Sequence, residues 1–136
     1  MAIETTPHAR AWITIQVIQL GVDAYIEKPM CLTIEEGRAM VDAAKKYQCV
    51  TQIGTQQRSM PLNNWACDLI QAGSIGNVKT VLAPNFIGPD PWVDKPEQPM
   101  PEGGPDGWWD VWTNSVPMRP YNGWIHRGWQ YWDDYD

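Results

Sequence analysis

Short β-type runs alternate with amphipathic helical runs along the chain, and this alternation is the feature that most constrains the fold. The β-type runs cover residues 23–26, 49–53 and 78–86, and the helical runs between them cover residues 34–47 and 61–70. A helix that joins two neighbouring strands of one sheet makes those strands parallel. The order therefore predicts βαβ units, an α/β fold and a mostly parallel sheet.

The two clearest helices carry their own start signals. Thr33 and Glu36 form a capping box, in which the side chain of each residue bonds the backbone amide of the other. Pro61 opens the next helix, and Gly73 stands where that helix should stop. Apolar residues recur every three or four positions in both segments, which is typical of helices that bury one face.

Residues 12–20 fit either a strand or a helix. Isoleucine and valine alternate there with threonine and glutamine, which is typical of a strand. The length of the run, the stop at Gly21 and the need for a crossover before residues 23–26 favour a helix. We therefore predict a helix.

In the run at residues 78–86, Pro84 indicates a bulge or an edge strand.

The triplet Glu27, Lys28 and Pro29 follows the β-type run at residues 23–26 and precedes a helix start. Ligands of open α/β sheets bind just beyond the carboxyl ends of the strands, so the triplet stands where a site would be expected. The run at residues 49–53 is followed in the same way by polar residues that could contact a ligand or only build a turn and a helix cap: Gln56, Gln57 and Arg58.

Four segments resemble consecutive landmarks of the Gfo/Idh/MocA family of nicotinamide-dependent sugar oxidoreductases, in the same order and spacing. They are residues 21–29, the helix from Ile34, residues 54–59 and residues 73–78. The tail is similar to a subgroup of the family with many sugar-active members, through residues 109–112, 117–122 and 128–133. The resemblance implies the C-terminal half of a Rossmann-like parallel sheet in residues 1–77. It implies the start of an α+β substrate domain, with a long irregular tail rich in Trp and Pro, in residues 78–136.

The resemblance also implies roles for individual residues. In the family the lysine of the triplet points toward the nicotinamide and the substrate hydroxyl, so Lys28 would be catalytic, bonding the developing alkoxide or acting as a base. NAD or NADP would be the cofactor, and a sugar or cyclitol the substrate. The implied cofactor-binding residues are Glu27, Pro29, Thr5, Gln56 and Gln57, with a cis Lys28–Pro29 bond. The implied substrate-binding residues are Arg58, Arg119, Tyr121 and His126.

Two features of the family do not occur in this sequence. It contains no Gly-x-Gly-x-x-Gly turn to receive a pyrophosphate, and it ends before the segment that supplies a catalytic histidine in the family. The resemblance thus implies an internal portion, which we expect to be inactive alone. Thr6 stands where the family usually has a proline, and Arg10 where it has a histidine, at the wall beside the nicotinamide.

The residues leave alternatives open. His8 is typical of a loop residue and Arg10 of a solvated helix charge, although either could belong to the site. The tail from Gly88 holds seven of the nine tryptophans, and these could stack on sugar rings or cover the nucleotide domain or a neighbouring subunit. Two classes of function are then open. The first is hydride transfer between NAD(P) and a hydroxyl group of a sugar or cyclitol, which includes the transient oxidation that some enzymes use to cleave a glycoside. The second is a non-catalytic module that serves assembly or carbohydrate binding.

Charge and composition narrow the range of partners. The net charge is −6 with a pI near 4.7, which argues against nucleic acid, since phosphate contacts need clustered cations. No apolar run approaches the roughly 20 residues of a membrane span. The spacing of Cys31, Cys49 and Cys67 indicates no metal site and favours reduced thiols in a cytoplasmic environment. Without the first three strands of the family fold, the sheet would expose an edge, so we expect a homo-oligomer or a partner chain that covers it.

Overall fold

The computed structural model describes residues 1–83, 95–102, 107–132 and 134–135 of the chain. The chain divides into two compact units, which are described separately. The first comprises Met1–Gly54 together with Lys95–Asp136, and the second comprises Thr55–Asp94.

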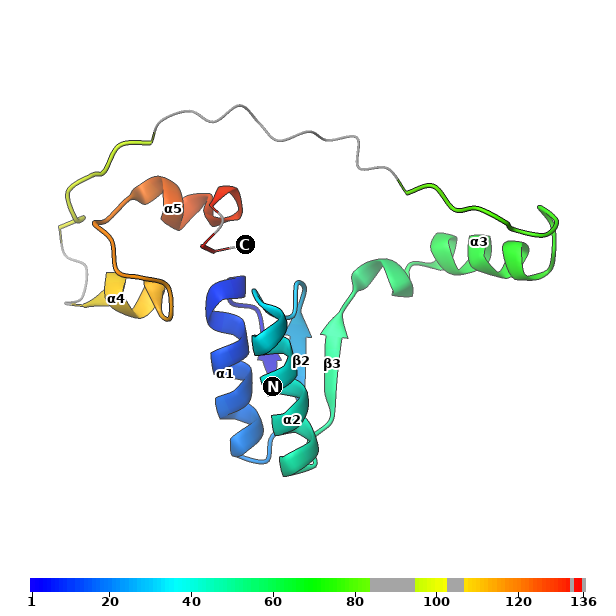
Figure 1. Cartoon of the computed structure of the whole chain (residues 1–136), viewed down its shortest axis with the longest axis horizontal. Helices are drawn as coiled ribbons and strands as arrows, with labels where there is room; N and C mark the ends of the chain where they lie inside the picture. The colour runs from blue at the N-terminus through cyan, green and yellow to red at the C-terminus, as the bar shows by residue number, and fades with distance from the viewer. Residues whose placement is uncertain (84–94, 103–106, 133, 136) are drawn as a thin grey trace. The chain divides into compact units, whose positions relative to one another are not determined.

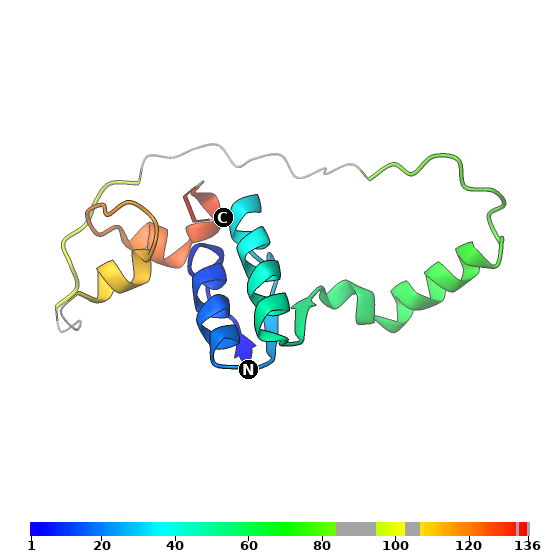
Figure 2. The same ribbon diagram turned by 60° about the horizontal axis from the view of Figure 1, so that its bottom comes forward.

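The first unit contains a parallel sheet of three strands. Its order is β1 (Ala2–Ile3), β2 (Ala24–Glu27) and β3 (Thr51–Gly54). Helix α1 (Pro7–Gln19) joins the first two strands and α2 (Ile34–Tyr47) the second pair, and the two helices lie side by side (Figures 1 and 2). The predicted βαβ units and parallel sheet are therefore confirmed.

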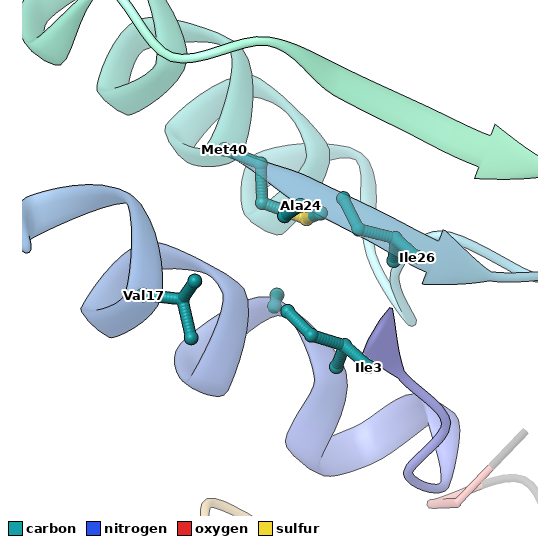
Figure 3. Packing of buried hydrophobic residues seen from close by; sticks show 6 residues of the cluster. Ile3, Val17, Ala24, Ile26 and Met40 are labelled. Carbon is teal, nitrogen blue, oxygen red and sulfur yellow. The ribbon is translucent and has the colours of Figure 1, made fainter. Parts of the chain in front are cut away.

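The core of this unit lies between the sheet and its two helices. Ile3 and Ile26 are register partners on the inner face, and they pack with Val17 of α1 and Met40 of α2 (Figure 3). Alternate residues of a strand point to opposite faces. Tyr25, next to Ile26, is accordingly 53% exposed on the outer face.

The ambiguous run at residues 12–20 is helical up to Gln19, as predicted, and α1 begins earlier, at Pro7. Proline fits the first helical position because the amide hydrogen that it lacks would have no partner there.

Helix α2 has the predicted capping box. Thr33 Oγ1 accepts a hydrogen bond from Glu36 N at 3.2 Å, and Thr33 N donates to Glu36 Oε2 at 3.2 Å.

The second unit contains the short 3-10 helix η1 (Gln56–Ser59) and helix α3 (Pro61–Gln71). The helix ends ahead of Gly73, whose φ of 84° is the conformation that glycine adopts without strain. The strand predicted at residues 78–86 is wrong for residues 78–83, where no strand forms, and the rest of that run lies outside the described residues. A β-type run becomes a strand only where a neighbouring strand offers a ladder, which sequence pattern alone does not reveal.

The C-terminal part of the first unit has three short helical segments, α4 (Trp108–Thr113), α5 (Gly123–Arg127) and η2 (Trp129–Tyr131). Their core contains the buried side chains of Trp109, Val116, Ile125 and Tyr135. Partly buried aromatic side chains pack around it: Trp108, Trp112, Tyr121, Trp129 and Trp132. Aromatic packing orders this region, as its composition led us to expect.

None of the helices among the described residues is both long and apolar enough to cross a membrane. Within the same residues, no group of three or more His, Cys, Asp or Glu side chains is arranged to hold a metal ion. Cys31, Cys49 and Cys67 are free thiols.

Candidate functional site

Lys28 directly follows β2, the central strand of the sheet. Its side chain is exposed at the carboxyl edge, and the peptide bond to Pro29 is cis, as the sequence led us to expect. Because the three strands are parallel, their carboxyl ends share this edge. An exposed ammonium group at the centre of such an edge stands where ligands of open α/β sheets bind.

Glu27 is half-buried beside Gly54, its register partner at the end of β3. A Cβ atom on Gly54 would lie 2.9 Å from Glu27 Oε2 and 3.1 Å from Tyr25 Cε1. Both distances are shorter than normal van der Waals contact, so Gly54 allows the carboxylate and the Tyr25 ring to lie against the backbone of β3. The edge therefore combines a half-buried carboxylate with the exposed ammonium of Lys28.

Arg10 joins the loops that follow β1 and β2. Its side chain is only 2% exposed, and the guanidinium donates hydrogen bonds to the backbone carbonyls of Thr5 and Pro29. The interpretation of Arg10 as a solvated helix charge is therefore wrong. Arg10 lies on the same helical face as Pro7 and Thr14, both of which are also buried.

His8 joins α1 to the aromatic C-terminal region and is not the loop residue that its sequence context indicated. It is buried in the first turn of α1, and its Nε2 lies 2.7 Å from the carbonyl oxygen of Trp112. Its ring meets that of Tyr135 edge-on at 4.8 Å, and Ser115 Oγ donates a hydrogen bond to its backbone oxygen. Burial lowers the pKa of His8 below its usual value, although the hydrogen bond to the Trp112 carbonyl opposes this shift.

Three of the implied substrate-binding residues lie on or beside the aromatic cluster. Arg119 forms an ion pair with Asp134. Tyr121 packs edge-on against Trp108 with ring centres 5.5 Å apart, and the exposed His126 contacts the same indole ring at 5.5 Å. The aromatic side chains thus pack mainly on one another, and their binding role stays a prediction.

The polar residues after β3 belong to the second unit. Gln56, Gln57 and Arg58 form η1, and all three are exposed. Asn63 Nδ2 donates to both the backbone oxygen and Oε1 of Gln57 at 2.9 Å, so Gln57 fastens the turn to the start of α3. This local role was one of the two alternatives that the sequence left open.

The carboxyl edge suits one end of a dinucleotide better than the other. An ammonium group and a carboxylate can bond the hydroxyl and amide groups of a nicotinamide riboside. A pyrophosphate needs convergent backbone amides, which a Gly-x-Gly-x-x-Gly turn supplies and this sequence does not contain. The described residues at this edge therefore fit the nicotinamide end, and the sequence contains no Gly-x-Gly-x-x-Gly turn for the phosphates.

Comparisons with known proteins show what the N-terminal part of the chain is similar to. Residues 1–55 match an oxidoreductase family described as an NAD-binding Rossmann fold, GFO_IDH_MocA. Oxidoreductase P35 of Formosa agariphila is 29% identical over 76 residues, which are 56% of this chain and 24% of that protein. Levoglucosan dehydrogenase of Pseudarthrobacter phenanthrenivorans is 34% identical over 76 residues, which are 56% of this chain and 20% of that protein.

A solved structure agrees with these matches. Bacillus subtilis yvaA, a protein named as an oxidoreductase, superimposes with a TM-score of 0.51 and 27% identity, over 54% of this chain and 21% of that one. The chain spans about a quarter or less of the length of each of these relatives.

Proposed function

From the match of residues 1–55 to the Gfo/Idh/MocA oxidoreductase family, we propose that this chain serves hydride transfer between NAD or NADP and a hydroxyl group of a sugar or cyclitol. The observation that carries the proposal is the position of Lys28, exposed at the carboxyl edge beside the half-buried Glu27. Similarity to a levoglucosan dehydrogenase supports a sugar-derived substrate. In this scheme residues 1–77 hold the nicotinamide side of the site, and residues 78–136 begin the substrate side.

The chemistry assigned to the chain is modest. A bound nicotinamide ring supplies the hydride acceptor. Lys28 Nζ donates a hydrogen bond to the substrate oxygen and stabilises the negative charge that develops there, or in its neutral form takes the hydroxyl proton. Glu27, held against β3 at Gly54, bonds the ribose or orients the lysine. The chain acts together with a pyrophosphate-binding turn that these residues do not supply, in the cytoplasm and as part of an assembly.

The test is an NMR titration of the full chain with NADH at millimolar concentration. We expect the amide signals of Glu27, Lys28 and Gly54 to shift, and Lys28→Met to weaken binding about tenfold, or ~1.4 kcal/mol. Lys45→Met is the matched control, because Lys45 is exposed on α2. Shifts confined to other residues, or equal affinity of the two variants, would contradict the proposal.

A second candidate function is a non-catalytic assembly module, and the apolar side chains of α3 favour it. Leu62, Trp65 and Ile70 are all exposed in the second unit, which is unusual for an amphipathic helix. Calorimetry separates the two candidates. An assembly module would give heat of self-association on dilution and none with NAD or a panel of sugars.

A further inference from the structure

The guanidinium of Arg10 is held by backbone oxygens in the interior of the first unit. The guanidinium donates hydrogen bonds to the carbonyls of Thr5 and Pro29, which belong to the loops after β1 and β2. A buried cation is tolerated where its donors are satisfied, and backbone carbonyls are suitable acceptors for them. Arg10 thus occupies an internal position that a charge rarely takes without a structural reason.

The shape of arginine matters for this arrangement. A guanidinium presents its donors in a rigid planar fork, so one side chain can join two carbonyls at a fixed separation. A lysine carries a single point charge on a flexible stem and cannot reproduce that spacing. The loop that bears Lys28 and the loop after β1 are therefore both bonded to one rigid group, which α1 in turn anchors to the core.

We propose that Arg10 is a positioning residue, which fixes the direction in which Lys28 leaves β2 by tying the carbonyl of Pro29 to that of Thr5. The proposal rests on the proposed function only in its consequence for catalysis. The structural claim, that Arg10 makes the loop bearing Lys28 rigid, does not depend on a bound cofactor. Lys28 itself has an exposed side chain, so its orientation must come from the backbone on which it sits.

The test compares variants of the full chain by ¹⁵N relaxation. In the wild-type chain we expect order parameters near 0.85 for the amides of Thr5, Lys28 and Met30, and in Arg10→Met values below about 0.6 at the same amides. Arg10→Lys should be intermediate, because it retains the charge and can reach one carbonyl. If Arg10→Met fails to fold, the comparison of Arg10→Lys with wild type still tests the proposal.

A control in the same helix tests whether loss of stability alone could explain lower order parameters in the Arg10 variants. Val17 is buried two turns further along α1, and Val17→Ala removes core packing without touching either loop. If Arg10 positions the loops, Val17→Ala should lower the melting temperature and leave those three order parameters unchanged. Rigid loops in both Arg10 variants, or equal loosening in Val17→Ala, would overturn the proposal.

An NADH titration of the same samples separates this inference from the proposed function. If wild type binds at Lys28, we expect Arg10→Met to weaken binding about as much as Lys28→Met, near tenfold. Absence of binding by the wild-type chain would refute the proposed function, while the relaxation data would still decide the role of Arg10. Full affinity in Arg10→Met would overturn the positioning role.

Discussion

At the scale of single residues, two buried threonines differ in whether the side-chain hydroxyl has a hydrogen-bond partner. Thr14 Oγ1 is buried in α1 with no partner among the described residues, whereas the buried Thr113 Oγ1 donates to the backbone oxygen of Asp110 at 3.0 Å. A buried polar group without a partner carries a desolvation cost that a satisfied one does not. Replacement of each threonine by the isosteric valine should therefore have opposite effects.

We expect Thr14→Val to raise the free energy of unfolding by about 1 kcal/mol, and Thr113→Val to lower it by about 1 kcal/mol. Urea denaturation followed by tryptophan fluorescence measures both changes. A loss of stability in Thr14→Val would indicate that its hydroxyl bonds a water molecule or another group in solution.

His8 makes stability depend on pH. Burial lowers the pKa of His8 in the folded chain, so between that pKa and the usual value of 6.5 the unfolded chain binds more protons. The free energy of unfolding should therefore be independent of this group above pH 6.5 and fall as the pH drops below it. Glu36 opposes the shift, Arg10 reinforces it, and Tyr135 lies against the ring.

The measurement is the difference in unfolding free energy between wild type and His8→Gln as a function of pH. Glutamine can still donate to the Trp112 carbonyl but does not titrate. We expect the difference to change in favour of the variant as the pH falls from 7.5 to 5.5. His126→Gln is the control, because His126 is exposed. A flat difference for His8→Gln would contradict the prediction.

At the scale of elements, α2 shows what sequence can predict. Its start is fixed by contacts within four residues, because Glu36 Oε2 accepts from the amides of Leu32 and Thr33 while Thr33 Oγ1 accepts from Glu36. Such local bonds are visible in the sequence. The run at residues 78–83 has strand propensity yet forms no strand, because a strand depends on a distant partner.

The same distinction applies to the candidate site. The position of Lys28 and Glu27 at the carboxyl end of a strand could be predicted from a β-type run, a proline and a helix start, all of them adjacent in sequence. The burial of Arg10 and His8 could not, because their partners Pro29 and Trp112 are distant in sequence. Only the face they share with other buried residues of α1 gave a hint.

The capping box of α2 provides the prediction at this scale. Thr33→Ala should lower the free energy of unfolding by about 1 kcal/mol, and Thr33→Ser should restore most of that loss. In a double-mutant cycle with Glu36→Ala, the two losses should be less than additive, because the two side chains cap the same helical turn. Additive losses in urea denaturation would show that the two caps act independently.

At the scale of the whole molecule, α1 and α2 pack on the same face of the sheet in the first unit. Parallel sheets normally carry helices on both faces, because both faces are apolar. In the first unit Tyr25 and Gln52, which are register partners, are exposed on the other face of the sheet. In the second unit, Leu62 and Trp65 of α3 are 67% and 59% exposed. Exposed apolar surface of this kind favours association.

We therefore expect the chain to self-associate at micromolar concentration in sedimentation velocity, as its sequence led us to predict. The double substitution Leu62→Glu and Trp65→Glu should weaken association about tenfold or more, since each buried apolar side chain contributes ~1.5–3 kcal/mol. Ile34→Glu is the control, because Ile34 is also exposed, at 81%, but lies at the start of α2, where an acidic residue is favourable. A chain that sediments as a monomer at all concentrations would show that its own segments cover this surface in solution. If the α3 substitutions leave association unchanged, the associating surface would instead be the exposed face of the sheet. Tyr25→Lys tests that alternative.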